Sequence, residues 1–399
     1  MPRFTLSERG LLLLLAAIQF SHIMDFMIMM PMGPQLMREL AIGPAKFASL
    51  VSAYTWSAGL VGLVVTAFVD RFDRRKILLV MFAGFVLGTL ACALSRNFES
   101  LLLARILSGG FGGVSGALVM TIVADVVAPA RRAAGIGIVM TAFSLASALG
   151  VPAGLYLAQT FEWETPFFLI AGVGAGTWVI ALLGVPSLRG HFGAGPPVAR
   201  WKAMWTLVSN RNVQWALLFM STMVGAHFTV IPFMSPYLVT NVGLMERQLF
   251  LVYLTGGVLT IFTGPLVGRL ADRWGRRNVY TVVTLVASVV ILILTNAPRL
   301  GLGPVLVLAA FFFVFASGRF VPGQAIISLA VAAPQRGAFM SFSSCVRDLV
   351  SGLVSSLGGF IVIRSGETGL LQHYHWLGWI AVASGVASLW LARQVREVA

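Results

Sequence analysis

The stretch Asp70-Arg71-Phe72-Asp73-Arg74-Arg75 returns 202 residues later as Asp272-Arg273-Trp274-Gly275-Arg276-Arg277. A second pair of short loops, Pro129-Ala130-Arg131 and Pro334-Gln335-Arg336, is separated by 205 residues. Two matches at almost the same offset indicate an internal repeat. The sequence therefore predicts a chain built from two homologous halves.

The composition around these loops excludes a soluble protein. The chain has 399 residues, of which 58% are hydrophobic and 11% are charged, and its mean hydropathy is +0.89. Ordinary soluble domains are roughly 45–50% apolar and about 25% charged. A soluble enzyme, a disordered chain and a fibrous protein are all excluded, and most of the chain is expected to lie in lipid.

Long apolar runs separate the charged loops, and each is long enough to cross a bilayer, which takes about 20 residues. We predict twelve spans, at 10–36, 47–69, 77–95, 101–127, 133–159, 165–186, 213–239, 247–271, 279–297, 303–332, 338–363 and 376–393. The expected fold is an all-α membrane protein of two pseudo-symmetric six-helix bundles. The N-terminal bundle is placed at 1–186, a cytoplasmic linker at 187–212 and the C-terminal bundle at 213–399.

The distribution of basic residues predicts the orientation. If both termini are cytoplasmic, 19 of the 28 Lys and Arg lie on the cytoplasmic side and 6 on the other, as the positive-inside rule requires. The net charge of +14 follows from this bias. Because the basic residues form no contiguous face, nucleic acid is not an expected partner. The expected location is the plasma membrane, in bacteria the inner membrane.

Three motifs resemble those of a known family. The stretch 268–277 matches the pattern G-x-L-a-D-r-x-G-r-r, although the first copy has Thr66 and Asp73 in place of the two glycines. Arg105 is followed by Gly109, and residues 150–154 read Gly-Val-Pro-Ala-Gly. The chain resembles the major facilitator superfamily in its twelve-helix proton-antiporter branch, and within it the bacterial sugar and drug efflux transporters. One residue inserted before the proline departs from the antiporter motif.

The resemblance implies two mechanical roles. The charged loops would latch the two halves together, with Asp70 facing a helix N-terminus and an arginine reaching Asp125; alternatively, they form basic loops that only obey the positive-inside rule. Expected gating or latch residues are Asp70, Arg74, Arg75, Asp125, Asp272, Arg276, Arg347 and Asp348. Small residues and prolines would let helices at the interface between the halves pack closely and slide: Gly150, Pro152, Gly154, Gly264 and Gly268.

Ionisable residues inside a bilayer are functional candidates by default, since burying a charge there costs roughly 2.5–3.5 kcal/mol. Asp25, near the middle of the first run, is the expected proton carrier. Lipid penalises its charged form, whereas a nearby Arg105 would favour it. The alternative is a static ion pair. His22 would share the proton or only hydrogen-bond within the bundle.

The remaining intramembrane polar residues are assigned to the solute cavity or to gating. Arg319 is flanked by glycine and proline, so it is expected either to contact the solute or to pair with an acid. The other cavity candidates are His227, Tyr54 and Gln324. Each has the alternative of ordinary packing. Arg347 and Asp348 share a polar helix face with several serines and are expected to gate rather than to bind.

No nucleotide-binding loop, metal motif or catalytic set is apparent, so neither an enzyme nor a cofactor is expected. The sequence favours a proton-coupled secondary transporter, most simply a monomeric exporter of small solutes such as sugars or drugs. The alternatives are a proton symporter or facilitator for uptake on the same fold, and a polytopic membrane enzyme or sensor. The expected partners are a small-molecule solute, protons and lipid.

Overall fold

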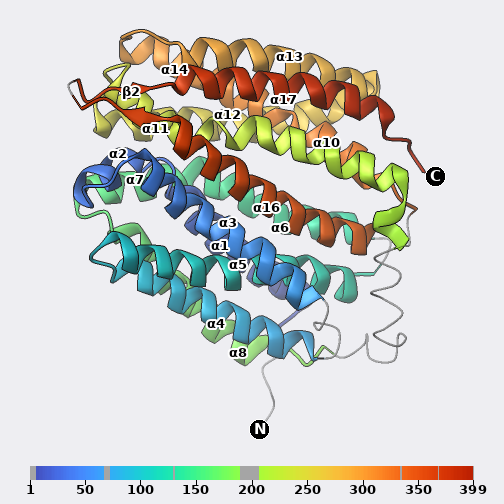
Figure 1. The fold of residues 1–399 in the computed structure, drawn as a ribbon. Coiled ribbons are helices and arrows are strands. Elements are labelled where there is room, and N and C mark those ends of the chain that lie inside the picture. Colours follow the sequence, from blue (N-terminus) through green and yellow to red (C-terminus); the bar gives the residue numbers. More distant parts are fainter. Residues whose placement is uncertain are drawn as a thin grey trace.

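Long apolar helices run side by side through a computed structural model that describes residues 6–66, 72–128, 131–188, 206–332, 335–366 and 368–398. The helices of the first half lie below those of the second in Figure 1. We call the end that carries α2 and the β hairpin the hairpin end. The end where α1 begins and α17 finishes is the termini end.

The described residues of the first half form nine helical elements. They are α1 (Glu8–Ile28), α2 (Gly33–Glu39), α3 (Pro44–Thr66), α4 (Arg74–Ala93), α5 (Phe98–Val126), α6 (Arg132–Leu145), the π-helical turn η3 (Ala146–Gly150), α7 (Val151–Thr160) and α8 (Thr165–Gly184).

The second half repeats this plan and adds a short hairpin. Its helices are α10 (Arg211–Phe228), α11 (Ile231–Thr240), η4 (Glu246–Gln248), α12 (Leu249–Trp274), α13 (Arg276–Thr295), α14 (Leu302–Phe311), the π-helical turn η5 (Phe312–Ser317), α15 (Phe320–Ser328), α16 (Arg336–Ile361) and α17 (Tyr374–Gln394). The strands β1 (Ile363–Arg364) and β2 (Leu371–Gln372) pair antiparallel, with Ile363 opposite Gln372.

The predicted all-α membrane fold is confirmed. Within the described residues, eleven helical segments are long and apolar enough to cross a membrane. The remaining predicted span, 338–363, is α16, which has 26 residues but includes six serines and the Arg347–Asp348 pair. It packs along α3 between the two halves, so protein rather than lipid covers much of its polar surface.

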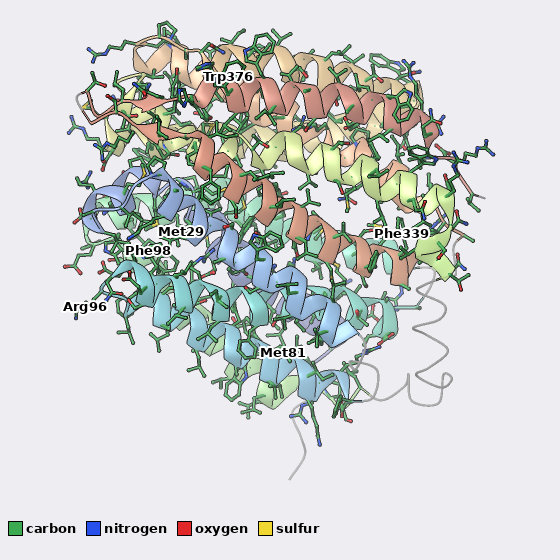
Figure 2. All side chains as sticks on the ribbon, in the orientation of Figure 1. Met29, Met81, Arg96, Phe98, Phe339 and Trp376 are labelled. Atoms are coloured by element: carbon green, nitrogen blue, oxygen red, sulfur yellow. The ribbon has the colours of Figure 1, made fainter. Side chains whose placement is uncertain are left out.

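Several predicted spans are interrupted rather than continuous. The run 10–36 bends at 29–32, because Pro31 and Pro34 lack the N–H group that a continuous helix needs. Asp25 consequently lies in the last turn of α1, toward the hairpin end and not at the middle of a span. Figure 2 shows Met29 and Phe98 toward this end and Phe339 toward the other.

The π-helical turns have a local cause. Pro152 cannot donate to the carbonyl of Ala148 and its ring would crowd that group, and the helix widens into η3 just before it. Pro322 similarly leaves the carbonyl of Gly318 without its helical donor, directly after η5. The backbone is therefore loosened next to Arg319.

The halves meet along α3–α16 and along α12 against η3 and α7. A methyl group added to Gly257 would lie 2.4 Å from the carbonyl oxygen of Ser147, so only glycine allows this crossing. Toward the termini end the same helix is open: Gly264 has no neighbour within 4 Å of such a methyl, and Gly268 only Val321 at 3.7 Å. The expected close packing at these two glycines is absent here, because α12 has diverged from the first half.

Gly150 and Gly154 do allow a close approach, but to a helix of their own half. Methyl groups on them would lie within 2.7 Å and 2.6 Å of Met24 on α1. Pro152 and Ala153 are the residues of this motif that line the groove beside α12 at the junction between the halves.

Candidate functional site

The most deeply buried charges in the first half form an ion pair. Arg105 Nη1 lies 2.8 Å from Asp25 Oδ2, and both side chains are 0% exposed. The same nitrogen donates to the backbone carbonyl of Asp25 at 3.1 Å, and Thr89 Oγ1 donates to Asp25 Oδ1 at 3.1 Å. The proposed proton carrier therefore faces neither lipid nor open space, and α1, α4 and α5 each supply a residue to its site.

Tyr54 connects this pair to His22. The Arg105 guanidinium lies over the Tyr54 ring, with its carbon Cζ 4.5 Å from the ring centroid. This is a favourable cation–π arrangement. The Tyr54 hydroxyl is 2.5 Å from His22 Nδ1. Gly112 makes room for both: a methyl group there would lie 2.5 Å from the Tyr54 hydroxyl and 3.1 Å from His22 Nδ1. The residues expected to couple protons thus form one connected cluster.

Tyr54 was expected to contact solute, yet it is only 2% exposed and engaged on both sides. The half-buried Phe26 packs against Tyr54 and also against Phe228 of the second half, at ring distances of 5.5 and 5.9 Å. This aromatic contact joins the two halves directly beside the ion-pair cluster.

The second half holds a buried arginine in a different setting. Arg319 is 1% exposed, and two of its nitrogens, Nε and Nη2, have no hydrogen-bond partner among the described residues. His227 stacks on Phe312 and meets Phe320 edge-on. Gln324 is half-buried on α15. The structure does not join these three candidates by any described hydrogen bond.

The charged residues of α16 lie between the halves. Arg347 Nε is 3.2 Å from Asp348 Oδ1, and Arg347 Nη2 donates to Ser344 Oγ at 2.7 Å. Both are partly exposed. Their expected gating role stays a prediction.

The charged loops make contacts within their own halves. Arg74 Nε is 3.3 Å from Asp125 Oδ2, and Arg75 Nη2 donates to the Leu182 carbonyl at 2.7 Å. In the second copy Arg276 lies 3.5 Å from Glu397, and Asp272 is exposed. The predicted partner of helix 336–361, Asp70, lies outside the described residues.

The two loop copies differ at one backbone position. Gly275 adopts a φ of +86°, which favours glycine. Asp73, its counterpart, has a φ of −60° and caps α4 by accepting from the Arg75 amide at 3.0 Å. It also accepts from the Leu188 amide at 3.0 Å. Sequence reasoning noted the substitution but missed that it fastens the chain after α8, as an N-cap aspartate before a helix can do.

An ion pair at the hairpin end also escaped the sequence analysis. Arg38 in the last turn of α2 pairs with Glu246 of η4, and Gln159 of α7 donates to the Glu246 carbonyl at 2.7 Å. Burial lowers the pKa of Arg38, but the hydrogen bonds and charges of Glu246 and Glu39 together raise it, and the net pKa is raised. These contacts tie the two halves together, and no sequence spacing relates residues so far apart.

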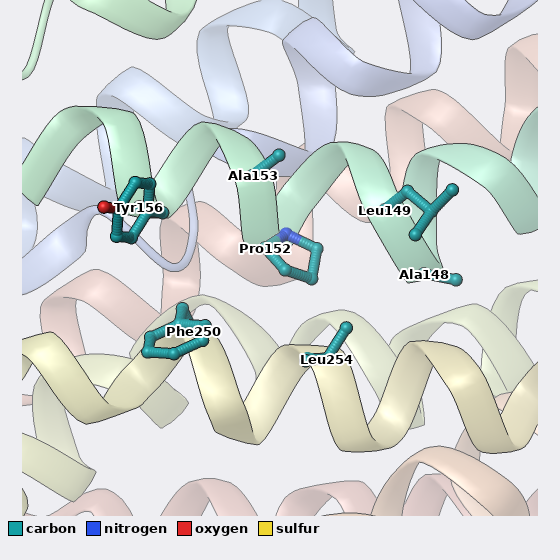
Figure 3. Close-up of a pocket in the computed structure, with 7 residues that line it drawn as sticks. All are labelled: Ala148, Leu149, Pro152, Ala153, Tyr156, Phe250 and Leu254. Carbon is teal, nitrogen blue, oxygen red and sulfur yellow. The ribbon is translucent and has the colours of Figure 1, made fainter.

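An apolar groove follows the junction between the halves on the outside of the bundle. It lies between η3 and α7 on one side and α12 on the other, and Figure 3 shows Pro152 and Tyr156 facing Phe250 and Leu254. Leu149 and Tyr156 are more than half exposed. In a membrane this groove opens toward lipid, and none of the buried charged residues lines it.

Known proteins resemble the whole chain. The chain is 26% identical to an uncharacterized MFS-type transporter of Bacillus subtilis (strain 168), YtbD, over 362 residues, which are 88% of this chain and 87% of that one. It is 29% identical to the inner membrane transport protein YdhP of Escherichia coli (strain K12) over 247 residues, 61% and 62% of the two chains.

Solved structures share the fold. A bacterial homolog of the human lysosomal transporter Spinster, inward-facing and unoccupied, has a TM-score of 0.77 at 16% identity, covering 96% of this chain and 97% of that one. A D-xylose-proton symporter has the same score and identity, covering 97% of each. Residues 15–295 and 217–398 match the family model of the Major Facilitator Superfamily. With its helices, its repeated loops and these matches, the chain belongs to that superfamily of membrane transporters.

Proposed function

We propose that this transporter is a proton-coupled exporter in which Asp25 carries the proton. The observation that supports this most is the Asp25–Arg105 pair, the one ion pair of the described residues whose two side chains are both 0% exposed. A buried pair is stable only while both charges are present. Protonation of Asp25 would therefore change the partners of Arg105 and the packing around it.

Contacts around the pair offer a way to transmit that change. Arg105 already touches the Leu50 carbonyl at 3.5 Å and the Tyr54 ring. When Asp25 is neutral, Arg105 would turn toward these groups, and Tyr54 would adjust against His22 and Phe26. Because Phe26 also packs on Phe228, the adjustment would reach the second half.

The arrangement of the halves supports alternating access. They are held together at the hairpin end and are apart along α12 at the termini end. With both termini in the cytoplasm, this corresponds to a cavity open to the inside. Rocking about the α3–α16 and α12–η3 crossings would open the other side, which is the mechanism that midplane sites in such transporters serve.

The charges of the site indicate the kind of solute. One unpaired arginine and one neutralised pair favour a neutral or anionic solute over a lipophilic dication, and sugars or small amphiphilic drugs meet this condition. A proton entering across about 100 mV supplies about 2.3 kcal/mol. The working unit would be a single chain in the plasma membrane.

Transport direction tests this proposal. A growth panel of drugs and sugars, with and without the chain, first identifies a solute. In inverted membrane vesicles with an acidic lumen, an exporter should then accumulate that solute in the lumen, and vesicles with Asp25→Asn should not. Solute driven out of the lumen by the same gradient would instead show symport and refute export.

A further inference from the structure

Two buried arginines of this transporter differ in how their charges are balanced. Arg105 is neutralised by Asp25 at 2.8 Å. Arg319 is buried to the same extent, but no carboxylate of the described residues forms an ion pair with it. An isolated charge in a low-dielectric interior is very costly. Because burying the unpaired Arg319 charge is so costly, we expect it to have an anionic partner that the described residues do not supply.

The described acids of the second half do not fill this role. Glu246, Asp272 and Glu397 lie outside the membrane-spanning interior, at η4, the end of α12 and the C-terminal segment. Asp348 is engaged with Arg347 on α16. Among the described residues, the guanidinium of Arg319 thus keeps two nitrogens, Nε and Nη2, free to donate.

Two residues with neutral hydroxyl groups, Thr284 and Ser288, meet Arg319 around Gly385. Beside Gly385 on α17, the point where a methyl group would lie is 4.0 Å from Arg319 Nη1, 3.5 Å from Ser288 Oγ and 3.5 Å from Thr284 Cγ2. Thr284 Oγ1 is buried without a hydrogen-bond partner in the described structure. Tyr280, buried one turn before Thr284 on the same helix, shares a 2.7 Å hydrogen bond with Ser388.

We infer that Arg319 and Thr284, beside the methyl-sized space at Gly385, bind the anionic group of the transported solute, a carboxylate or similar monovalent oxyanion. A guanidinium with two free N–H groups matches such an anion in a bidentate manner, and the Thr284 hydroxyl can donate a further hydrogen bond, whereas Ser288 Oγ already donates to the Thr284 carbonyl at 2.8 Å. This inference rests on the proposed function, because it assigns the solute of that transporter to the organic anions.

The loosened backbone gives the site a means of access. Arg319 follows the π-helical turn η5, and Pro322 removes a helical hydrogen bond one turn later. Phe320 and Gln324, on the same short helix, are half-buried. A small movement here would expose the guanidinium to the space between the halves without unfolding α15.

The first test measures the unfolding temperature of the purified full-length chain without added ligand. Arg319→Gln removes an unpaired charge, so its unfolding temperature should equal or exceed that of the wild type. Arg105→Gln leaves Asp25 unpaired and should lower it. A loss for Arg319→Gln as large as that for Arg105→Gln would show a structural cation and overturn the inference.

The second test adds ligands: sodium benzoate, acetate and phosphate, with benzamide as the neutral counterpart of benzoate. An organic carboxylate should raise the unfolding temperature of the wild type, since a ligand that binds only the folded state stabilises it. Arg319→Gln and Gly385→Ala should lose this rise. The new methyl of Gly385→Ala contacts its neighbours at ordinary distances but occupies the anion position.

Matched variants separate the site from general effects. Gly225→Ala also adds a methyl at ordinary contact distances, 3.8 Å from its neighbours, and Arg299→Gln removes an exposed arginine of the same half. Both should retain the carboxylate effect. Equal stabilisation by benzamide, or a carboxylate effect that survives in Arg319→Gln, would refute the site.

The same assay distinguishes a transported anion from a resident one. Stabilisation by phosphate alone, with no effect of either carboxylate, would indicate a bound inorganic ion and overturn the assignment of the solute. Carboxylate binding that persists in Asp25→Asn would leave this inference intact even where the vesicle experiment refutes proton-coupled export, so the two proposals can fail separately.

Discussion

At the scale of single residues, the ion pair in the first half constrains what any variant can do. Asp25 accepts from Arg105 and from Thr89, and Arg105 has no other carboxylate partner among the described residues. Removing one member of a buried pair typically costs about 3–5 kcal/mol, whereas replacing both is often tolerated. Effects on coupling and on folding must therefore be measured separately.

Asp25→Asn should abolish the dependence of transport on the pH gradient, because the amide keeps the size of the carboxyl but exchanges no proton. The variant should also unfold at a lower temperature, since Arg105 loses its counter-charge. Transport at a series of gradients, together with the unfolding temperature, measures both effects.

The double variant Asp25→Asn/Arg105→Gln should recover much of the lost stability while remaining uncoupled. Glu99→Gln, which neutralises an exposed acid in the first turn of α5, serves as the control and should change neither property. If Asp25→Asn transports with an unchanged response to the gradient, Asp25 is not the carrier.

At the scale of helices and loops, the hairpin end is held by the contact between α2 and η4. Arg38 pairs with Glu246 of the other half and, at 3.2 Å, with Glu39 of its own. The Arg38 side chain is 55% exposed, and exposed pairs contribute about 0–1 kcal/mol. Such an energy shifts the balance between two conformations by at most about fivefold.

Glu246→Gln should consequently favour opening of the hairpin end by a few-fold, while Glu39→Gln should not, because Glu39 lies in the same half as Arg38. The two conformations can be counted by the reactivity of a cysteine at the termini end, described below. Equal reactivity in Glu246→Gln and in Glu39→Gln would show that this ion pair does not hold the halves together.

The sequence predicts an element well when the element depends on residues close together in the chain, and poorly when it depends on contacts between distant segments. Apolar length alone predicted the spans, including 338–363, which is the polar α16. The turns at 29–32 and η3 follow from prolines but shift boundaries by several residues. The α2–η4 contact and the crossing at Gly257 depend on how two separate halves dock, which no local pattern encodes.

For the candidate site, too, the sequence predicted some features and left others open. Charge inside an apolar run was enough to single out Asp25, Arg105 and Arg319, because lipid tolerates few such residues. The sequence analysis also placed Arg105 beside Asp25, and the two side chains do form an ion pair. For Arg319 it left open either solute contact or pairing with an acid, and nothing in the sequence indicates that this arginine has no carboxylate partner among the described residues.

At the scale of the whole molecule, one face of α12 contacts the first half toward the hairpin end and is separated from it toward the termini end. Gly257, Gly264 and Gly268 are seven and four residues apart, which places them on one side of a helix. Gly257 is pressed against η3, whereas the other two have diverged from the first half. Closing the termini end would require this face to meet α6 along its length.

Gly268→Cys should therefore react with a membrane-impermeant maleimide in the conformation described here and should be protected when the termini end closes. Both native cysteines are buried, so their background reaction should be small. With both termini cytoplasmic, Gly268→Cys should react rapidly in inverted vesicles and Met245→Cys, which is 48% exposed beside η4, in right-side-out vesicles.

Glu246→Gln should slow the reaction of Gly268→Cys a few-fold, because opening one end closes the other. If Gly268→Cys reacts at one rate whatever the gradient or the state of Glu246, the halves do not rock about these crossings; if it reacts from the outside, the orientation is the reverse.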